Sequence, residues 1–151
     1  MIYYFDTSAV VKYYTSETGS NQVIEIIENG SSYVYISQIG IVEVAAALSK
    51  KMRTHEISIE DYKSSYSLFQ SDILTKQYFI VQLNDQIVEV AVSLTSLYPL
   101  KGYDAVHLSS AITLNSVMLQ KNIPPIHFIS SDKTLCKSAK KEGLNVSDLN
   151  T

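Results

Sequence analysis

The sequence is poor in the residues that covalent cross-links and metal–thiolate sites require. Its 151 residues include one cysteine, Cys136, and no tryptophan. A single cysteine cannot form an internal disulfide, and no cluster of Cys or His residues accompanies it, so neither a disulfide framework nor a structural zinc site is expected. We expect Cys136 to be a small core residue.

Long apolar runs are also missing. No segment approaches the roughly 18 consecutive apolar residues of a membrane-spanning helix. The first residues lack the basic start, apolar stretch and small-residue cleavage site of a signal peptide. We therefore expect a cytoplasmic protein with no membrane partner. With 46% hydrophobic residues, the chain can bury a core as a single domain over residues 1–151.

Positive charge is not in excess. The 12 Lys and Arg residues stand against 15 Asp and Glu residues, which gives a formal net charge of −3. This balance argues against a protein that binds nucleic acid by bulk electrostatic attraction. A cluster of carboxylates would itself lower the total, however, and a bound divalent ion reverses the sign locally. The distribution of charge is more informative than its sum.

Strand-like and helix-like segments alternate along the chain. Strands are expected at 2–5, 33–36, 78–83 and 126–129, and a short fifth strand at 144–146. Helices are expected at 8–14, around 23–27, and at 38–51, 58–73, 85–97, 102–120 and 133–142. This alternation predicts an α/β fold, with a mostly parallel central sheet of four or five strands flanked by helices in three layers.

The helix expected at 38–51 has apolar residues on almost every side. We expect Ser37 to cap it and the helix to be substantially buried. Glu43 is the only charged residue between Glu28 and Lys50. A charge in such a helix needs a partner or a wet cleft.

Three further acids stand alone near strand ends or at the start of a helix. Asp6 follows the first strand and Asp132 the fourth, so both carboxylates emerge at one edge if these strands are central and parallel. Asp104 lies in the first turn of its helix, where the helix dipole favours a carboxylate. Each acid alone also has a structural explanation, as a helix cap or a first-turn charge. Their coincidence with Glu43 favours a functional cluster.

Converging carboxylates repel one another unless protons or a hard cation intervene. Mg²⁺ or Mn²⁺ suits oxygen ligands and leaves room for water and phosphate. Such an ion can acidify a water molecule and neutralise charge on a leaving oxygen. We therefore predict phosphodiester hydrolysis without a protein nucleophile, with metal ligands that are also the catalytic residues: Asp6, Glu43, Asp104 and Asp132.

Four segments follow one another in a recognisable order and spacing: YFDTSAVVK at 4–12, IVEV at 41–44, YDAVHLSSA at 103–111 and FISSDKTL at 128–135. Together they resemble the PIN-domain nucleases, in particular the VapC-type toxins of bacterial and archaeal toxin–antitoxin pairs. The resemblance spans nearly the whole chain, although Ser130-Ser131 stands where many relatives have a Thr-led pair.

The resemblance implies a PIN-like fold and an endoribonuclease that cuts RNA with Mg²⁺ or Mn²⁺. It places the four acids on the family's metal ligands, and Ser8 and Ser130 on hydroxyl positions that support the site. It also implies a small antitoxin as partner, with an arm over the acidic cleft, and a homodimer. His107 matches a frequent position, where a packed or hydrogen-bonded histidine is favoured over a ligand or base.

A run of lysines begins directly after Asp132. The four follow i, i+4, i+7, i+8 spacing and so share one side of the last helix: Lys133, Lys137, Lys140 and Lys141. This arrangement is typical of phosphate contacts that position RNA without reading its sequence. A solvated helix face is the structural alternative.

Two other functions stay open. An aspartyl-phosphate-type phosphatase also has an Asp after its first strand, but that chemistry uses a second acid two positions on, where this chain has Ser8. A non-catalytic PIN-derived or receiver-like domain could bind a partner through the same acids. The presence of all four acids favours the nuclease over both.

Overall fold

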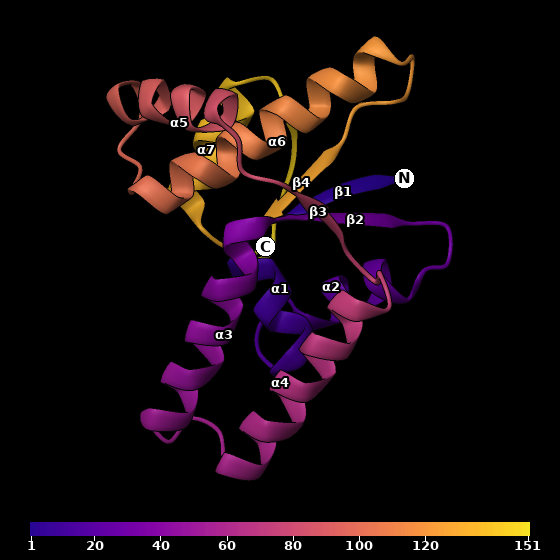
Figure 1. Cartoon of the computed structure of the whole chain (residues 1–151), viewed down its shortest axis with the longest axis vertical. Coiled ribbons are helices and arrows are strands. Elements are labelled where there is room, and N and C mark those ends of the chain that lie inside the picture. Colours follow the sequence, from indigo (N-terminus) through magenta and orange to yellow (C-terminus); the bar gives the residue numbers. More distant parts are fainter.

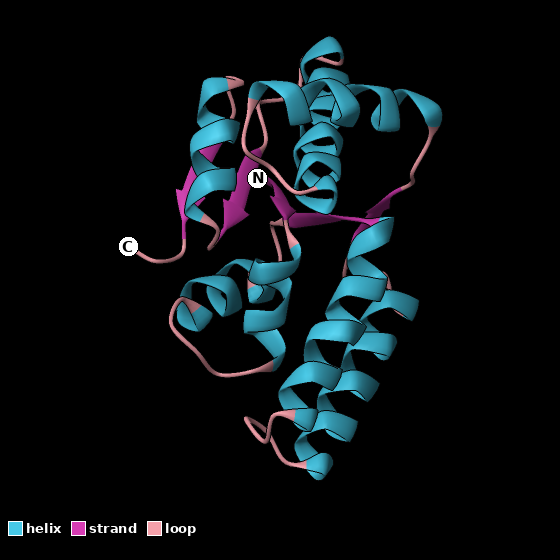
Figure 2. Cartoon of the chain, turned by 90° about the vertical axis from the view of Figure 1, so that its left-hand side faces the viewer, coloured by secondary structure: helices cyan, strands magenta, loops and turns pink.

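The computed structural model describes residues 1–151 as a sheet between two layers of helices (Figures 1 and 2). The strands are β1 (Ile2–Phe5), β2 (Tyr33–Ser37), β3 (Phe79–Val81), β4 (His127–Ser130) and β5 (Asn145–Asp148). The helices are α1 (Thr7–Tyr14), α2 (Ser20–Glu28), α3 (Gln38–Arg53), α4 (Ile59–Leu74), α5 (Asp85–Leu97), α6 (Gly102–Gln120) and α7 (Lys133–Lys141). The α/β prediction is confirmed. No helix combines the length and apolar character that a membrane crossing requires.

The sheet has the strand order β3-β2-β1-β4-β5, and every neighbouring pair is parallel. β1 is the central strand, with Phe5 opposite Ile36 of β2 on one side and Ile129 of β4 on the other. The carboxyl ends of β1 and β4 therefore lie side by side. This is the arrangement that brings Asp6 and Asp132 to one edge.

Each central strand contributes to two cores, one on each face of the sheet. Tyr4 and Phe128 pack with α5, α6 and α7, whereas Phe5 and Ile129 pack with α1 to α4. Successive side chains of a strand point to opposite faces, and helices cover both faces here, so both sets are buried (Figure 2). Cys136 is buried too, as expected.

Side-chain caps begin five of the helices, each by accepting a backbone N–H of the first turn: Asp6, Ser37, Ser58, Asn84 and Asp132. Such a cap typically contributes about 1 kcal/mol. Asp6 and Asp132, two of the acids predicted as site residues, are thus helix caps, as the structural alternative expected.

The prediction that the helix at 38–51 is substantially buried is wrong. Only Gly40, Val44 and Leu48 of α3 are buried, and Val42 is 69% exposed. α3 and α4 form a hairpin that extends past the sheet (Figures 1 and 2), so α3 packs along a narrow stripe against α1 and α4. Apolar composition alone does not reveal where the covering layer ends.

A buried tyrosine pair ties α1 to α4 and to the start of β3. The Tyr14 hydroxyl donates to Asp72 Oδ2 at 2.6 Å and lies 2.8 Å from the Tyr78 hydroxyl. Tyr14→Phe leaves the buried Tyr78 hydroxyl and the partly buried Asp72 carboxylate without this partner. We therefore expect a loss of about 1–3 kcal/mol in the free energy of unfolding, measured by urea denaturation. Tyr62→Phe, whose hydroxyl has one long contact to Ser49, should stay within about 0.5 kcal/mol. Equal losses would contradict this account.

Candidate active site

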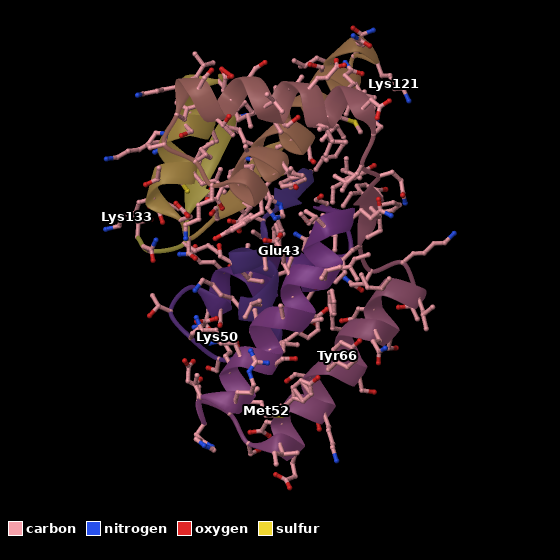
Figure 3. The ribbon with its side chains drawn as sticks, turned by 60° about the vertical axis from the view of Figure 1, so that its left-hand side comes forward. Glu43, Lys50, Met52, Tyr66, Lys121 and Lys133 are labelled. Atoms are coloured by element: carbon pink, nitrogen blue, oxygen red, sulfur yellow. The ribbon has the colours of Figure 1, made fainter.

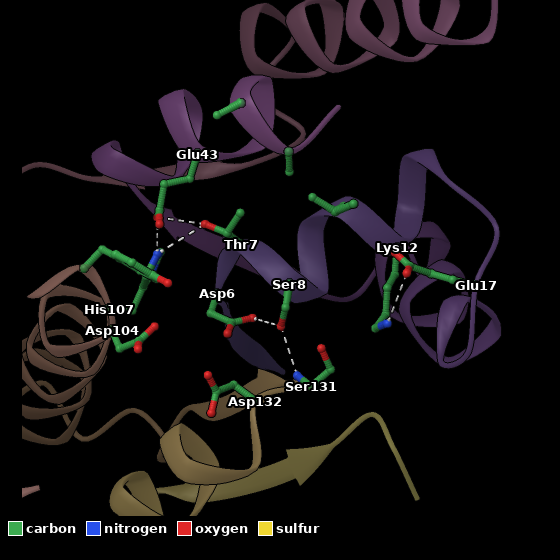
Figure 4. A pocket seen from close by; sticks show the side chains of 14 residues that line it. Asp6, Thr7, Ser8, Lys12, Glu17, Glu43, Asp104, His107, Ser131 and Asp132 are labelled. Carbon is green, nitrogen blue, oxygen red and sulfur yellow. Dashed lines mark hydrogen bonds and ion pairs between the residues drawn. The ribbon is translucent and has the colours of Figure 1, made fainter. Parts of the chain in front are cut away.

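All four acids predicted from the sequence line one pocket of about 490 Å³ at the carboxyl edge of β1 and β4 (Figure 4). Asp6 follows β1, Glu43 comes from α3, Asp104 from the first turn of α6, and Asp132 from the junction of β4 and α7. The fold thus gathers side chains from four separate segments at one place.

Asp6 is 5% exposed and is held by two serines. Ser8 Oγ donates to Asp6 Oδ1 at 2.7 Å, and Ser130 Oγ donates to Oδ2 at 2.6 Å. Ser8 in turn accepts from the backbone N–H of Ser131, and Ser130 from that of Asp132. Because each serine oxygen accepts an N–H, its own proton is directed at the carboxylate. Both serines stand where the family resemblance expects supporting hydroxyls.

Burial and mutual repulsion act on these carboxyl groups. Burial raises the pKa of Asp6, although His107 and the two serine hydroxyls oppose the rise. Burial also raises the pKa of Asp104, and the nearby charge of Asp132 raises it further. None of the ion pairs in the chain includes Asp6, Asp104 or Asp132. The three carboxylates therefore face one pocket without a paired cation.

Glu43 has the partner that its position called for. Its Oε1 accepts from Thr7 Oγ1 at 2.8 Å and pairs with His107 Nε2 at 2.5 Å (Figure 4). On the other side of the ring, the Tyr4 hydroxyl lies 2.8 Å from His107 Nδ1. Burial alone would raise the pKa of Glu43. The hydrogen bond to His107 and the charge of His107, together with the hydrogen bond from Thr7, lower this pKa. His107 is 2% exposed. It is the hydrogen-bonded helix histidine that the sequence favoured, and it keeps Glu43 ionised.

The donor set fits a hard cation. All its groups are carboxylates, and three of them lack a counter-charge. As placed, no three His, Cys, Asp or Glu side chains converge closely enough to hold one ion between them. Such spacing is compatible with Mg²⁺, which keeps several waters and binds through one or two protein carboxylates in most sites. Asp6, with both oxygens oriented, is the best-fixed of these carboxylates.

The predicted lysine stripe lies outside the pocket. Lys133, Lys137, Lys140 and Lys141 are all exposed on α7, and none lines the pocket. Figure 3 shows Lys133 on the outer surface while Glu43 lies at the inner end of α3. The lysine stripe is therefore an exposed surface that does not line the pocket.

Several pocket residues were missed by the sequence reasoning. Thr7 holds Glu43, and Lys12, Glu17 and Tyr103 also line the pocket. For Lys12 the available signal was helical spacing, because Lys12 lies one turn after Ser8 and therefore on the same side of α1.

The parallel strand order and the pocket of carboxylates at the strand ends define an α/β protein with a candidate site for a hard cation. Residues 3–141 match the family model described as the PIN domain. The chain belongs to the PIN domain family. The sequence resemblance is thereby confirmed.

Three known proteins illustrate the relationship. Ribonuclease VapC45 of Mycobacterium tuberculosis is 32% identical over 114 residues, which cover 74% of this chain and 75% of that protein. The structure of VapBC2 from Rickettsia felis bound to a promoter DNA fragment aligns with a TM-score of 0.60 at 18% identity, covering 98% of both chains. The structure of VapBC-1 from nontypeable Haemophilus influenzae aligns with a TM-score of 0.60 at 16% identity, covering 100% of both chains. At such identities the two structures show a shared fold.

Replacing Asp104 should stabilise the cation-free protein at neutral pH. A raised folded-state pKa means that ionising the carboxyl group opposes folding, and the penalty disappears below the unfolded pKa of about 3.9. In EDTA at pH 7.5, Asp104→Asn should raise the free energy of unfolding by up to about 1 kcal/mol, since solvent screens a half-exposed group. The gain should vanish near pH 4, as measured by urea denaturation.

The matched control is Asp85→Asn, which changes an exposed first-turn acid of α5. This substitution should not stabilise the protein, because it removes a favourable helix-dipole interaction and relieves no repulsion. If the two variants behave alike at pH 7.5, the repulsion assigned to Asp104 is absent.

Proposed function

We propose that residues 1–151 form a single metal-dependent endoribonuclease domain, the toxin of a VapBC-type toxin–antitoxin pair. The observation that carries this proposal is the set of four acids in one pocket, three of them without a paired cation. Membership of the PIN domain family and 32% identity to a protein named as a ribonuclease support RNA as the substrate.

The carboxylates proposed to bind Mg²⁺ or Mn²⁺, directly or through its waters, are Asp6, Glu43, Asp104 and Asp132. When bound, such an ion supplies an acidified water and charge neutralisation at the phosphate. Asp6 contributes a carboxylate whose direction is set by Ser8 and Ser130. Glu43 contributes a carboxylate kept ionised by His107. In the net reaction the water oxygen bonds to phosphorus, the bond to the leaving ribose oxygen breaks, and a water proton replaces it.

No side chain of the pocket is set up as a nucleophile. The hydroxyls of Ser8 and Ser130 donate to Asp6, and no base is placed to take their protons. Both oxygens of Asp6 already accept hydrogen bonds, and the second acid of an aspartyl-phosphate phosphatase is replaced by Ser8. Direct attack by water on the phosphodiester is the reaction that suits these contacts.

A small antitoxin is the proposed protein partner, together with homodimer formation. An apolar groove between α3 and α4 is lined by Ile41, Phe69 and Leu74 among others, and Leu74 is 83% exposed. Such a groove suits a protein chain, and the acidic pocket suits an arm that carries Arg or Lys. A chain that stays monomeric and does not bind the product of the neighbouring gene in co-purification would refute both parts.

RNA cleavage tests the proposed activity. Wild-type protein should cut RNA in Mg²⁺ or Mn²⁺ and stop in EDTA. Asp6→Asn and Asp104→Asn should each lower the rate by at least about 100-fold, because each removes a carboxylate from the proposed ion site. Products resolved on denaturing gels give the rates, and Asp85→Asn serves as an active control. Absence of cutting by pure wild-type protein under every metal condition, or equal cutting by the variants, would show that the domain is a binding module or acts by another mechanism.

Cation binding can be measured without activity. Mn²⁺ should raise the melting temperature of the wild-type protein, because an ion that binds only the folded state stabilises it by about 2.7 kcal/mol at 100 times its Kd. The shift should be much smaller for Asp6→Asn and should persist for Asp85→Asn. A wild-type protein with no shift, or the same shift in all three proteins, would exclude this site.

A further inference from the structure

Lys12 is the only Lys or Arg residue among those that line the acidic pocket. It lies in α1, one helical turn beyond Ser8, and is 7% exposed. Lysine is rarely this buried unless its charge is compensated. A buried ammonium group that opens into the acidic pocket therefore needs a physical reason.

The aliphatic part of Lys12 is held in place by the chain around it. Gly19 has a φ of +90°, and a Cβ there would lie 2.9 Å from the carbonyl oxygen of Leu149 and 3.3 Å from Lys12 Cδ. Without a side chain at Gly19, the loop between α1 and α2 can close over Lys12. A side chain already ordered in this way loses little conformational entropy when it binds a ligand.

The ammonium group itself is only loosely paired. Its one ion pair is with Glu17 Oε2 at 3.9 Å, too long for a hydrogen bond. Glu17 is shared with Lys51, whose Nζ lies 3.8 Å from the same oxygen. Figure 4 shows Lys12 and Glu17 at one end of the pocket, Glu43 and His107 at the other, and Asp6 and Asp132 between them. Lys12 thus keeps donors available at the end of the acidic site.

We propose that Lys12 binds a phosphate of the RNA chain next to the one that is cleaved. This inference rests on the proposed function, in which the acids and their cation take the scissile phosphate. An RNA strand that follows the pocket then brings a flanking phosphate to Lys12. An ammonium group recognises phosphate as a point charge and independently of sequence. Glu17 is the weak counter-ion that the phosphate replaces.

The test is the affinity for a fluorescein-labelled single-stranded RNA of about 12 nucleotides, measured by fluorescence anisotropy in EDTA over a range of KCl. Lys12→Met keeps the buried stem and removes the charge. It should weaken binding about fivefold to tenfold at low salt. It should also reduce the slope of log K against log[KCl] by about 0.7, the contribution of one phosphate contact on a single strand.

Two further variants separate this contact from general charge effects. Lys51→Met removes the other lysine that pairs with Glu17. Lys51 lines a neighbouring pocket and not the acidic one, so this substitution should leave the slope unchanged. Lys12→Arg should restore the slope. Circular dichroism checks the fold of each variant, and Lys12→Gln replaces Lys12→Met if the latter does not fold.

An unchanged slope for Lys12→Met, an equal change for Lys51→Met, or no RNA binding by the wild-type protein would overturn the inference. Its failure is distinguishable from that of the proposed function. If the wild-type protein binds RNA through Lys12 but cuts none, the Lys12 contact stands and the proposed hydrolysis is wrong. If the wild-type protein cuts RNA and Lys12→Met binds RNA as tightly as wild type, the hydrolysis stands and the Lys12 contact is wrong.

Discussion

The pairing of β1 with β4 is the constraint on which the site depends. It places Ser130 and the turn after β4 against Asp6, so that both oxygens of a buried carboxylate accept hydroxyl protons. A carboxylate this deeply buried would be costly without such bonds. The serines are oriented in turn by N–H groups of Ser131 and Asp132. The most central strand pair of the sheet and the best-ordered carboxylate of the pocket are therefore parts of one hydrogen-bonded unit.

The order of the elements could be predicted from the sequence because it depends on local patterns. Short apolar, β-prone runs marked the strands, and a capping residue such as Ser37 marked a helix start. The position of β1 between β2 and β4 depends on crossovers whose lengths do not specify a neighbour, so only the parallel arrangement was expected. The exposure of Val42 could not be predicted either, since it arises where α3 extends past the sheet. Hydropathy describes a segment and not what covers it.

The four acids line one pocket, as expected from the sequence, but the physical reason for Glu43 changed. The sequence argument was that a buried helix cannot carry an unpaired charge, and α3 is not buried throughout. Glu43 is nevertheless paired, because Tyr4 holds His107 from the far side and His107 holds Glu43. A contact between residues 43 and 107 depends on how α6 meets α3, which no local pattern encodes. Lys12 was missed as a pocket residue because a lysine in a helix is usually solvated.

The net charge of −3 does not contradict a site for a polyanion, because the charge is distributed unevenly. The acids of the pocket are the groups that a cation would neutralise. Burial raises the pKa of Asp104, and the repulsion from Asp132 that adds to this rise is relieved when positive charge arrives. The same repulsion makes the cation-free pocket a source of instability, as functional sites often are. Lys12 lies at the end of this pocket with only a loose counter-ion. A pocket with carboxylates at its centre and a loosely paired lysine at one end suits a ligand that brings a metal ion to the acids and a phosphate to the lysine.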